Sequence, residues 1–320
     1  MKEWKIAIVG AGYMAQEHAK AFASLPGVRI VGICGRTASR AESLAQAHGA
    51  ATFDSIDALY RETRADVVVV AVNELSMAEV AKACFAHPWV CFLEKPVGID
   101  AHQAHEILAA SQQARARCHV ALNRRTYAAT RQALTELESD PSPRLVSILD
   151  QQDMAAARDS GQPDAVVRNY MYANSIHLID YMHVFCRGTV KSVDNIKPWH
   201  PEYPGTVIAA VHFDSGDTAL YQAVWNGPGP WSVTVSTAQS RLEMRPLEKL
   251  GIQRRGERRL TEVAPDSVDT DFKPGLRVQA ERIMAGLGGS PIDLATLEEA
   301  TQSMDLCALI YGQPIASKLH

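Results

Sequence analysis

Residues Trp4–Ala15, WKIAIVGAGYMA, decide the fold of the first part of this 320-residue chain. Trp4–Val9 is a short apolar run typical of a buried strand, and from Met14 onward small and apolar residues recur at helical spacing. Gly10 and Gly12 lie between the two segments. A strand, a glycine-rich turn and a helix in this order predict the first unit of a dinucleotide-binding fold, in which a pyrophosphate meets the N–H groups at a helix N-terminus.

The residues of this turn have separate tasks in such a fold. Gly10 allows the tight turn, Gly12 lets the backbone approach the pyrophosphate, and Ala15 still permits close packing of helix on strand. Tyr13 and Met14, in the first helical turn, are further candidate cofactor contacts. A turn without a ligand and the related loop of a methyltransferase remain as alternatives.

The apolar runs that follow continue the alternation of strand and helix up to Leu122. The strands expected after the first are Val28–Ile33, Ala51–Phe53, Asp66–Val72, Val90–Leu93 and Cys118–Leu122. The run Asp66–Val72 is almost wholly apolar, which is typical of a central strand buried on both faces. Residues 1–122 are therefore predicted to form a Rossmann domain of the α/β class, a doubly wound parallel sheet that binds NAD(P).

Residues 123–320 have a different pattern and predict an α+β domain for substrate binding and oligomerisation. Strands are expected at 145–149, 190–196, 206–213, 218–225 and 231–237, and helices at about 125–138, 174–185, 275–286 and 293–311. Residues of several strands alternate in polarity, as in a mostly antiparallel sheet with one covered face. The last helix carries one apolar stripe, and we expect it to pack back on the first domain.

Composition excludes several classes of partner. The net charge of −4 gives no basic field for nucleic acid or for an anionic membrane, and no apolar run approaches the length of a membrane helix. The six cysteines show neither a disulfide framework nor metal-ligand spacing, so no metal site is predicted. Without a signal peptide, the expected location is the cytoplasm.

The segment after the second strand, Cys34–Arg40, bears on the choice of cofactor. An acidic residue here would bind the ribose 2′-hydroxyl of NAD, whereas arginine accommodates the phosphate of NADP. No carboxylate is present, and Arg36, Thr37 and Arg40 can receive a phosphate, so NADP is favoured over NAD. An arginine that stacks on adenine in an NAD enzyme is the alternative. Asn73, after the fourth expected strand, is a further candidate cofactor contact.

Glu94-Lys95-Pro96 ends the fifth expected strand, at the edge where such sheets bind ligands. With Gly10-Ala11-Gly12 and a later helix bearing His177 and Asp180, this tripeptide resembles the glucose–fructose oxidoreductase/inositol dehydrogenase/MocA (Gfo/Idh/MocA) family. The resemblance implies an open-faced sheet in the second domain. It also implies a homodimer or homotetramer formed through that sheet. It further implies that Glu94 lies at the cofactor and that Lys95 contacts both cofactor and substrate as a catalytic or orienting cation.

The segment Asn174–Tyr181 holds the expected proton-transfer group. On a helix, Asn174, His177 and Tyr181 share one face, and Asp180 lies beside His177, where it can orient the ring or raise its pKa. Removal of hydride from an alcohol also requires loss of the hydroxyl proton, and a neutral histidine can accept it. A core histidine bonded to the backbone is the alternative. Many family members carry an aspartate four residues before this histidine, where this chain has Ala173.

Polar residues near the end of the first domain are candidate substrate contacts. The candidates are Asn123, Arg124 and Tyr127, with Arg168 further along the chain. Arg124, Arg125 and Arg168 can bind a phosphate, a carboxylate or a nucleotide-sugar diphosphate, or can form interdomain salt bridges instead. The segment 152–169 is expected to be a loop that covers the substrate.

These residues together predict an NAD(P)-dependent oxidoreductase. Hydride would pass between nicotinamide and a carbon of a sugar, a cyclitol, or a nucleotide- or phospho-sugar derivative, with Lys95, His177 and Asp180 as the catalytic set. Two alternatives remain: an NAD-dependent glycoside hydrolase of the same family, and a non-enzymatic NAD(P)-binding sensor or scaffold protein.

Overall fold

The chain divides into two compact units. The computed structural model describes residues 3–203, 205–229 and 231–315. The first unit runs to Asn123 and includes Thr270–Thr301, and the second contains Arg124–Asp269 and the chain from Gln302 onward.

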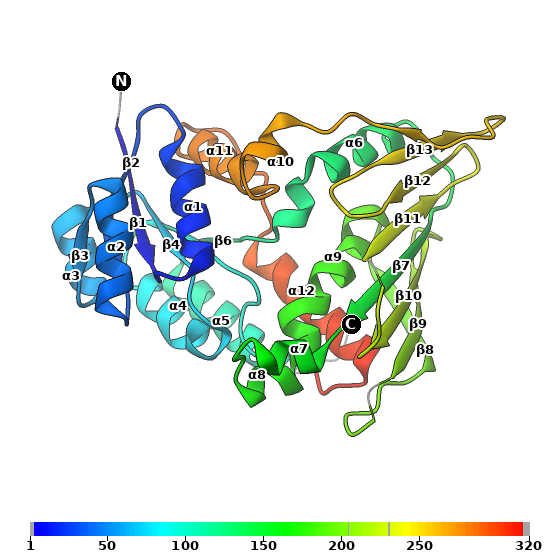
Figure 1. Cartoon of the computed structure of the whole chain (residues 1–320), viewed down its shortest axis with the longest axis horizontal. Coiled ribbons are helices and arrows are strands. Elements are labelled where there is room, and N and C mark those ends of the chain that lie inside the picture. The colour runs from blue at the N-terminus through cyan, green and yellow to red at the C-terminus, as the bar shows by residue number, and fades with distance from the viewer. Residues whose placement is uncertain (1–2, 204, 230, 316–320) are drawn as a thin grey trace. The chain divides into compact units, whose positions relative to one another are not determined.

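The first unit is built on a sheet of six parallel strands in the order β3-β2-β1-β4-β5-β6 (Figure 1). The strands are β1 (Trp4–Val9), β2 (Val28–Cys34), β3 (Ala51–Phe53), β4 (Val67–Val70), β5 (Val90–Leu93) and β6 (Arg117–Val120). This is the strand order of a doubly wound dinucleotide-binding fold, so the predicted fold of this part is confirmed.

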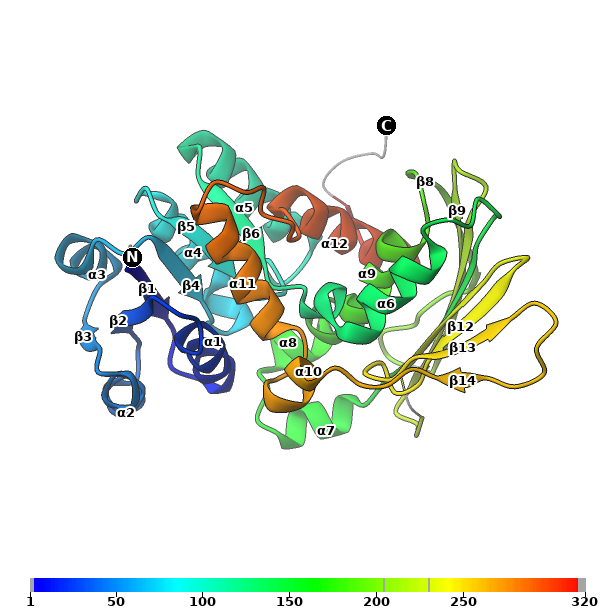
Figure 2. The same cartoon turned by 90° about the horizontal axis from the view of Figure 1, so that it is seen from above.

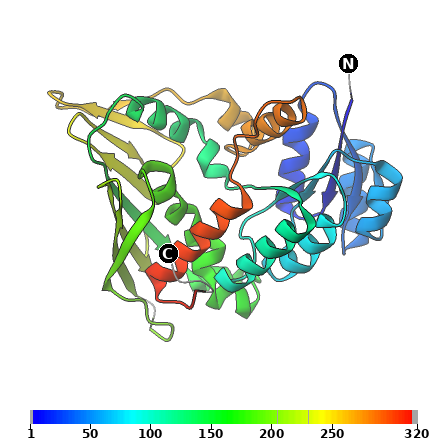
Figure 3. The ribbon, with the colours of Figure 1, turned by 180° about the vertical axis from the view of Figure 1, so that it is seen from behind.

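Helices cover both faces of this sheet. They are α1 (Tyr13–Ala23), α2 (Ala38–His48), α3 (Ile56–Thr63), α4 (Met77–Phe85), α5 (Ala101–Ala114) and α11 (Leu276–Leu287), with a short helix η1 (Glu74–Ser76) before α4. On one face, Ile6 and Ile8 of β1 pack with buried residues of α1, α2 and α11. On the other face α4 and α5 lie side by side, as Figure 3 shows in cyan.

The segment Thr270–Thr301 departs from the expected division at residue 122. Leu276, Ile283 and Leu294 are buried in the same cluster as Ile6, so apolar burial joins this segment to the first unit. The predicted last helix is α12 (Leu297–Tyr311), which changes units after Thr301. Its apolar stripe is buried as expected, but Tyr311 packs within the second unit, against Tyr221 and Trp225.

The second unit contains an eight-stranded sheet in the order β14-β13-β12-β11-β7-β10-β9-β8. The strands are β7 (Leu145–Gln152), β8 (Val190–Lys197), β9 (Thr206–Phe213), β10 (Thr218–Trp225), β11 (Ser232–Ser236), β12 (Ser240–Met244), β13 (Gly251–Arg254) and β14 (Thr261–Glu262). β7 and β10 pair in parallel, and the other pairs are antiparallel, which confirms a mostly antiparallel sheet. The sequence did not predict β12–β14, which are short and largely polar.

Helices lie on one face of this sheet and leave the other bare, as seen from above in Figure 2. The helical segments are η2 (Asn123–Thr126), α6 (Ala128–Leu137), α7 (Met154–Asp159), α8 (Asp164–Arg168), the π-helical turn η3 (Met171–Ser175), α9 (Ile176–Phe185) and α10 (Ser267–Asp271). Along β7 the pattern follows the pleat: Val146 and Ile148 are fully buried, whereas Leu145 and Leu149 are about 40% exposed. The prediction of a loop at 152–169 was wrong, because α7 and α8 form there.

Two further features bear on the expected classes of site. Within the described ranges, no helix combines the length and apolarity that crossing a membrane requires. The six cysteines are free thiols.

Candidate functional site

Gly10 occupies a position that only glycine can fill. Its φ of 116° is in the left-handed region, and a Cβ built there would lie 2.1 Å from the carbonyl oxygen of Ala71. The Gly10 N–H donates to the carbonyl of Cys34 at 2.8 Å. The first glycine therefore lets the end of β1 pass close to the chain that leaves β4.

Gly12 is the N-cap of α1 and is open on its outer side. A Cβ added at Gly12 would meet no described atom within 4 Å. The cap has no side-chain hydrogen bond, and the first N–H groups of a helix have no partner within the helix. Free space next to unpaired N–H groups suits the pyrophosphate of a dinucleotide.

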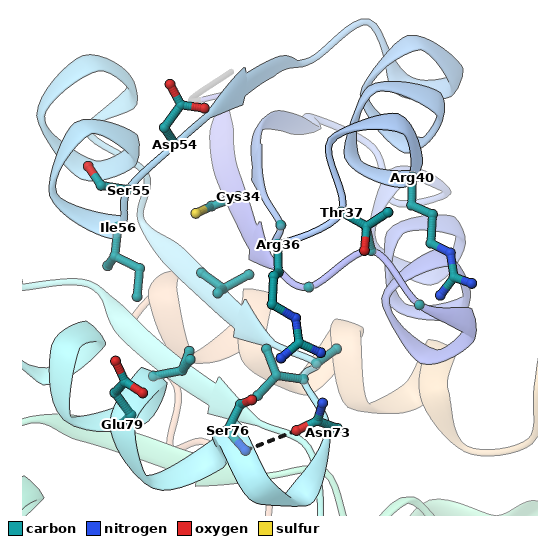
Figure 4. A pocket seen from close by; sticks show the side chains of 18 residues that line it. Cys34, Arg36, Thr37, Arg40, Asp54, Ser55, Ile56, Asn73, Ser76 and Glu79 are labelled. Carbon is teal, nitrogen blue, oxygen red and sulfur yellow. Dashed lines mark hydrogen bonds between the residues drawn. The ribbon is translucent and has the colours of Figure 1, made fainter. Parts of the chain in front are cut away.

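A cavity of about 610 Å³ opens above this turn, within the first unit (Figure 4). It is lined by residues at or after the carboxyl ends of β1–β4: Val9, Gly10, Ala11, Gly12, Cys34, Gly35, Arg36, Thr37, Arg40, Asp54, Ser55, Ile56, Ala71, Val72, Asn73, Ser76, Glu79 and Val80. The structure thus brings together six of the predicted cofactor contacts: Gly10, Gly12, Arg36, Thr37, Arg40 and Asn73. Tyr13 and Met14 are outside this lining, and the Tyr13 ring, 62% exposed, packs under the Lys273 ammonium.

The cationic side of the cavity comes from the segment after β2. Figure 4 shows Arg36 extending toward Asn73 and Ser76, and Arg40 projecting from α2 beside Thr37. Asn73 uses its side-chain oxygen to accept a hydrogen bond from the Ser76 N–H at 2.9 Å, so it caps η1.

Sequence reasoning missed the acidic side of the cavity. Asp54 directly follows β3, and Glu79 lies on α4. Burial and the nearby Asp54 charge raise the pKa of the Cys34 thiol. Because the carboxyl ends of parallel strands meet at one edge, the position of Asp54 after the third strand was a usable signal.

Glu94 and Lys95 lie at the end of β5. The Glu94 carboxylate is 5% exposed; one oxygen lies 2.7 Å from His18 Nε2 on α1, and the other accepts from the Lys95 N–H at 3.1 Å. The Lys95–Pro96 peptide is cis. Glu94 therefore links the Lys95 backbone to His18 of α1. The sequence did not predict this contact with His18.

His177 is the second residue of α9 in the second unit and is 6% exposed. The π-helical turn that precedes α9 carries Asn174, whose amide nitrogen donates to Gln152 Oε1 at 2.8 Å. Such turns occur often at functional sites. The His177 ring centroid lies 6.2 Å from that of Trp231, a residue that the sequence indicated only as part of a strand.

Arg124 lies on the same aromatic group. Its guanidinium carbon is 5.0 Å from the Trp231 ring centroid and 5.9 Å from that of Tyr127. The Trp231 indole N–H donates to the Gln151 carbonyl at 2.9 Å, which fixes the ring. Predicted site residues His177, Arg124 and Tyr127 are thus grouped around Trp231.

The sequence suggested that Asp180 acts on His177, but the hydrogen bonds of its carboxylate come from Arg125 and Ser303. Its two oxygens accept from Arg125 at 2.8 and 2.9 Å, and Ser303 donates to one of them at 2.7 Å. Burial alone would raise the pKa of Asp180, but the Arg125 charge and these hydrogen bonds hold it below its usual range. Asp180 is therefore an ionised partner of Arg125, and its effect on His177 stays a prediction.

The remaining candidates are dispersed. Asn123 is buried and donates to the Pro274 carbonyl at 3.1 Å, within the first unit. Arg168 is exposed at the end of α8. Among the described residues, no three His, Cys, Asp or Glu side chains are grouped as metal ligands would be.

Comparison with known proteins agrees with this geometry. Residues 4–122 match the family described as an oxidoreductase family with an NAD-binding Rossmann fold, GFO_IDH_MocA. The UDP-N-acetylglucosamine 3-dehydrogenase of Acidithiobacillus ferrooxidans is 27% identical over 114 residues, 35% of each chain. The inositol 2-dehydrogenase of Rhizobium meliloti is 27% identical over 121 residues, 38% of this chain and 36% of that protein. The chain thus matches little more than a third of the length of these relatives.

A likeness in structure extends over nearly the whole chain. A solved structure of the Acidithiobacillus ferrooxidans dehydrogenase superposes with a TM-score of 0.79 at 17% identity and covers 98% of both chains. At this identity the likeness shows a shared fold. The match to the family model covers residues 4–122, the part of the chain that forms the parallel sheet of the first unit.

Proposed function

We propose that this protein is an NAD(P)-dependent dehydrogenase that acts on a hydroxyl-bearing carbon of a sugar, a cyclitol or a derivative of these. The observation that carries the proposal is the cavity above Gly10 and Gly12, with free helix N–H groups on one side and Arg36 on the other. Its lining fits a pyrophosphate and an adenosine phosphate. The match of residues 4–122 to NAD-binding oxidoreductases supports it.

NADP is the cofactor that the lining favours. Arg36 and Arg40 both line the cavity, and a guanidinium binds a phosphate in a two-pronged geometry, so we propose that one or both bind the 2′-phosphate of NADP. Asp54 also lines the cavity, and its negative charge opposes binding of the extra phosphate of NADP, so the two arginines must outweigh it.

Each predicted catalytic residue has a proposed role. The bound nicotinamide would supply a hydride acceptor or donor. His177 would take the hydroxyl proton as the alcohol is oxidised and return it in the reverse direction, a role worth about 100- to 10,000-fold in rate. Lys95 would orient the cofactor ribose and the substrate hydroxyl. Asp180, which Arg125 keeps ionised, would complete the proposed catalytic set on α9.

Two residues of the second unit support the proposed substrate class. Trp231 has an aromatic ring on which a sugar can pack, and Arg124, whose guanidinium lies over that ring, offers a cation for a phosphate or carboxylate. The two relatives are named for activity on UDP-N-acetylglucosamine and inositol, both rich in hydroxyl groups. We propose Asn123, Tyr127 and Arg168 as further contacts.

The bare sheet face is where we propose homodimer or homotetramer contacts. Leu149, Val224 and Ile196 are 41%, 45% and 64% exposed on this sheet. Exposed apolar side chains on one open face are typical of subunit interfaces.

The test is a screen read as absorbance change at 340 nm with NAD and with NADP. Probes are myo-inositol, phosphorylated sugars and UDP-N-acetylglucosamine, each with wild type and His177→Ala. Turnover by the wild type and its loss in the variant are expected. Full activity of His177→Ala would overturn the assigned mechanism. Cofactor that co-purifies without net turnover on any probe would favour the glycoside hydrolase, which oxidises its substrate only transiently.

A further inference from the structure

A set of buried polar side chains lies on the covered face of the second sheet. Along β7 the inward positions change from aliphatic, Val146 and Ile148, to polar, Asp150 and Gln152. On the parallel neighbour β10, Tyr221 and Trp225 face the same side. Asp150 is 3% exposed and Gln152 is 1% exposed. A carboxylate at this depth is costly unless its hydrogen bonds are satisfied.

One carboxylate oxygen of Asp150 is the last acceptor in a chain of hydrogen bonds. Trp225 Nε1 donates to the Tyr311 hydroxyl at 3.3 Å, the Tyr311 and Tyr221 hydroxyls are 2.7 Å apart, and Tyr221 donates to Asp150 Oδ2 at 2.5 Å. An indole N–H can only donate, so the Tyr311 oxygen accepts from Trp225. Tyr221 gives its single proton to Asp150, so in the pair of hydroxyls Tyr311 donates and Tyr221 accepts.

The other oxygen of Asp150 fixes two amides in series. Gln152 Nε2 donates to Asp150 Oδ1 at 2.5 Å, and Gln152 Oε1 accepts from Asn174 Nδ2 at 2.8 Å. A carboxylate can only accept, so Gln152 must turn its nitrogen to Asp150 and its oxygen to Asn174. Asn174 must then turn its nitrogen to Gln152, which leaves its Oδ1 on the opposite side.

In the described part of the chain, the groups that bond Asp150 are all neutral: Tyr221, Gln152, Ser175 and the Gln151 backbone. Burial raises the pKa of Asp150, and these hydrogen bonds oppose that rise. If a cation were paired with Asp150, the carboxylate would be stabilised whichever way the neighbouring amides were turned. Because its partners are neutral, the carboxylate is stabilised only when they turn their N–H or O–H groups toward it.

We propose that Asp150 and Gln152 are positioning residues that fix Asn174 with its carbonyl oxygen toward the substrate, so that this position accepts a hydrogen bond from a substrate hydroxyl. Asn174 is half-buried and lies one turn before His177. The selected substrate carries a free hydroxyl there, and an ether or a carbonyl at the same place is rejected. This inference rests on the dehydrogenase function proposed above.

The Asp150→Asn variant should reverse the direction of the hydrogen bonds that run from position 150 through Gln152 to Asn174. Because Trp225 still donates to Tyr311, we expect Tyr311 to keep donating to Tyr221 and Tyr221 to position 150, so the new amide turns its oxygen to Tyr221 and its nitrogen to Gln152. Gln152 then presents its nitrogen to Asn174, and Asn174 presents its own nitrogen to the substrate. The Asp150→Asn substitution keeps the size and shape of the side chain at position 150, but it replaces the Asn174 oxygen that faces the substrate with the Asn174 nitrogen.

The test is a double-mutant cycle of Asp150→Asn and Asn174→Asp, read as the midpoint of thermal unfolding. In the Asn174→Asp variant two carboxylates compete for the single nitrogen of Gln152, and the midpoint should fall by about 3–8 °C. In the double variant the new amide at position 150 donates to Gln152, and Gln152 donates to the new carboxylate at position 174. Asn174→Asp should then cost little or raise the midpoint. An equal loss in both backgrounds would overturn the proposal.

Two further readouts separate this proposal from the activity itself. In a neutron structure of the wild-type protein, deuterium on Asn174 should face Gln152, and an oxygen there would contradict the proposal even if a variant failed to fold. With UDP-N-acetylglucosamine or myo-inositol as probe, Asp150→Asn should raise KM about 10-fold with a smaller effect on kcat. Because the cycle and the neutron structure need no substrate, they decide the orientation of Asn174 even if the 340 nm screen finds no turnover, and the change in KM tests its contact with the substrate.

Discussion

The glycine turn of the first unit and the π-helical turn of the second both precede a helix, but they are built from different parts of the chain. At Gly10 and Gly12 the groups that matter are backbone N–H groups and the space left by missing side chains. At Asn174 the group that matters is an amide whose direction depends on Gln152 and Asp150, more than 20 residues away.

The comparison shows that backbone sites and side-chain sites are encoded differently. A backbone site needs glycines at fixed offsets, so a few adjacent residues specify it. A side-chain site needs partners that only the folded sheet brings together. Substitutions should therefore act locally at the first turn and through distant partners at the second.

The largest effect is expected for His177→Ala. Loss of the group that exchanges the hydroxyl proton should lower kcat by about 100- to 10,000-fold, with the affinity for NADP unchanged. The measurement is steady-state turnover beside a cofactor titration. His212→Ala is the matched control, since His212 pairs with Asp194 at the surface. An equal loss in the control would remove His177 from the mechanism.

Substitution of Gly10 should lower the stability of the fold, whereas substitution of Gly12 should lower the affinity for the cofactor. Gly10→Ala places a Cβ against the Ala71 carbonyl at a positive φ, and should lower the free energy of unfolding by at least about 3 kcal/mol. Gly12→Ala meets no described atom, so the thermal midpoint should hold while cofactor affinity falls about 10-fold or more. Denaturant unfolding and a fluorescence titration measure the two effects. A Gly12→Ala protein with unchanged affinity would contradict the placement of the pyrophosphate.

Arg36→Ala should change the choice of cofactor. Loss of one charge-assisted hydrogen bond should raise KM for NADP about 10- to 100-fold and that for NAD much less. Arg29→Ala is the control, because Arg29 pairs with Glu3 and lies outside the cavity lining. Equal changes for both cofactors would leave NADP without support.

The smallest effect concerns a structural carboxylate of the second unit. Burial would raise the pKa of Asp217, but hydrogen bonds from Arg187 and Arg144 and the Arg187 charge lower it to about 2. Because the folded pKa lies below the unfolded one, its stabilisation is present above pH 4 and is lost as pH falls toward 2. Arg187 is partly exposed, so Asp217→Asn should cost only about 1–2 kcal/mol at pH 7. A constant difference between the two proteins from pH 7 to pH 2 would contradict this assignment.

Much of the first unit could be predicted from the sequence. Its strands are short apolar runs, and Gly10, Gly12, Arg36 and Arg40 are close to strand ends. The acidic side of the cavity was missed although the strand Ala51–Phe53 was predicted, because only the segment after the second strand was considered for the ribose. The return of Thr270–Thr301 to this unit depends on apolar burial between distant segments, which no local pattern indicates.

Less of the second site could be predicted. His177 and Asn174 were found from their helical spacing, but the pairing of Asp180 with Arg125 depends on a contact across 55 residues. Trp231 was assigned to a strand and gave no sign of its contact with Arg124. Asp150 and Gln152 gave no signal, because the expected strand ended at Leu149 and Gln152 was assigned to the expected loop 152–169.

The proposed roles of both units require that the protein binds a nicotinamide dinucleotide. A fluorescence titration of the wild-type protein with NADPH and NADH tests this claim most directly. The cavity above Gly10 and Gly12 predicts saturable binding of both, with NADPH the tighter because of Arg36 and Arg40. Absence of binding by either dinucleotide at millimolar concentration would contradict the account.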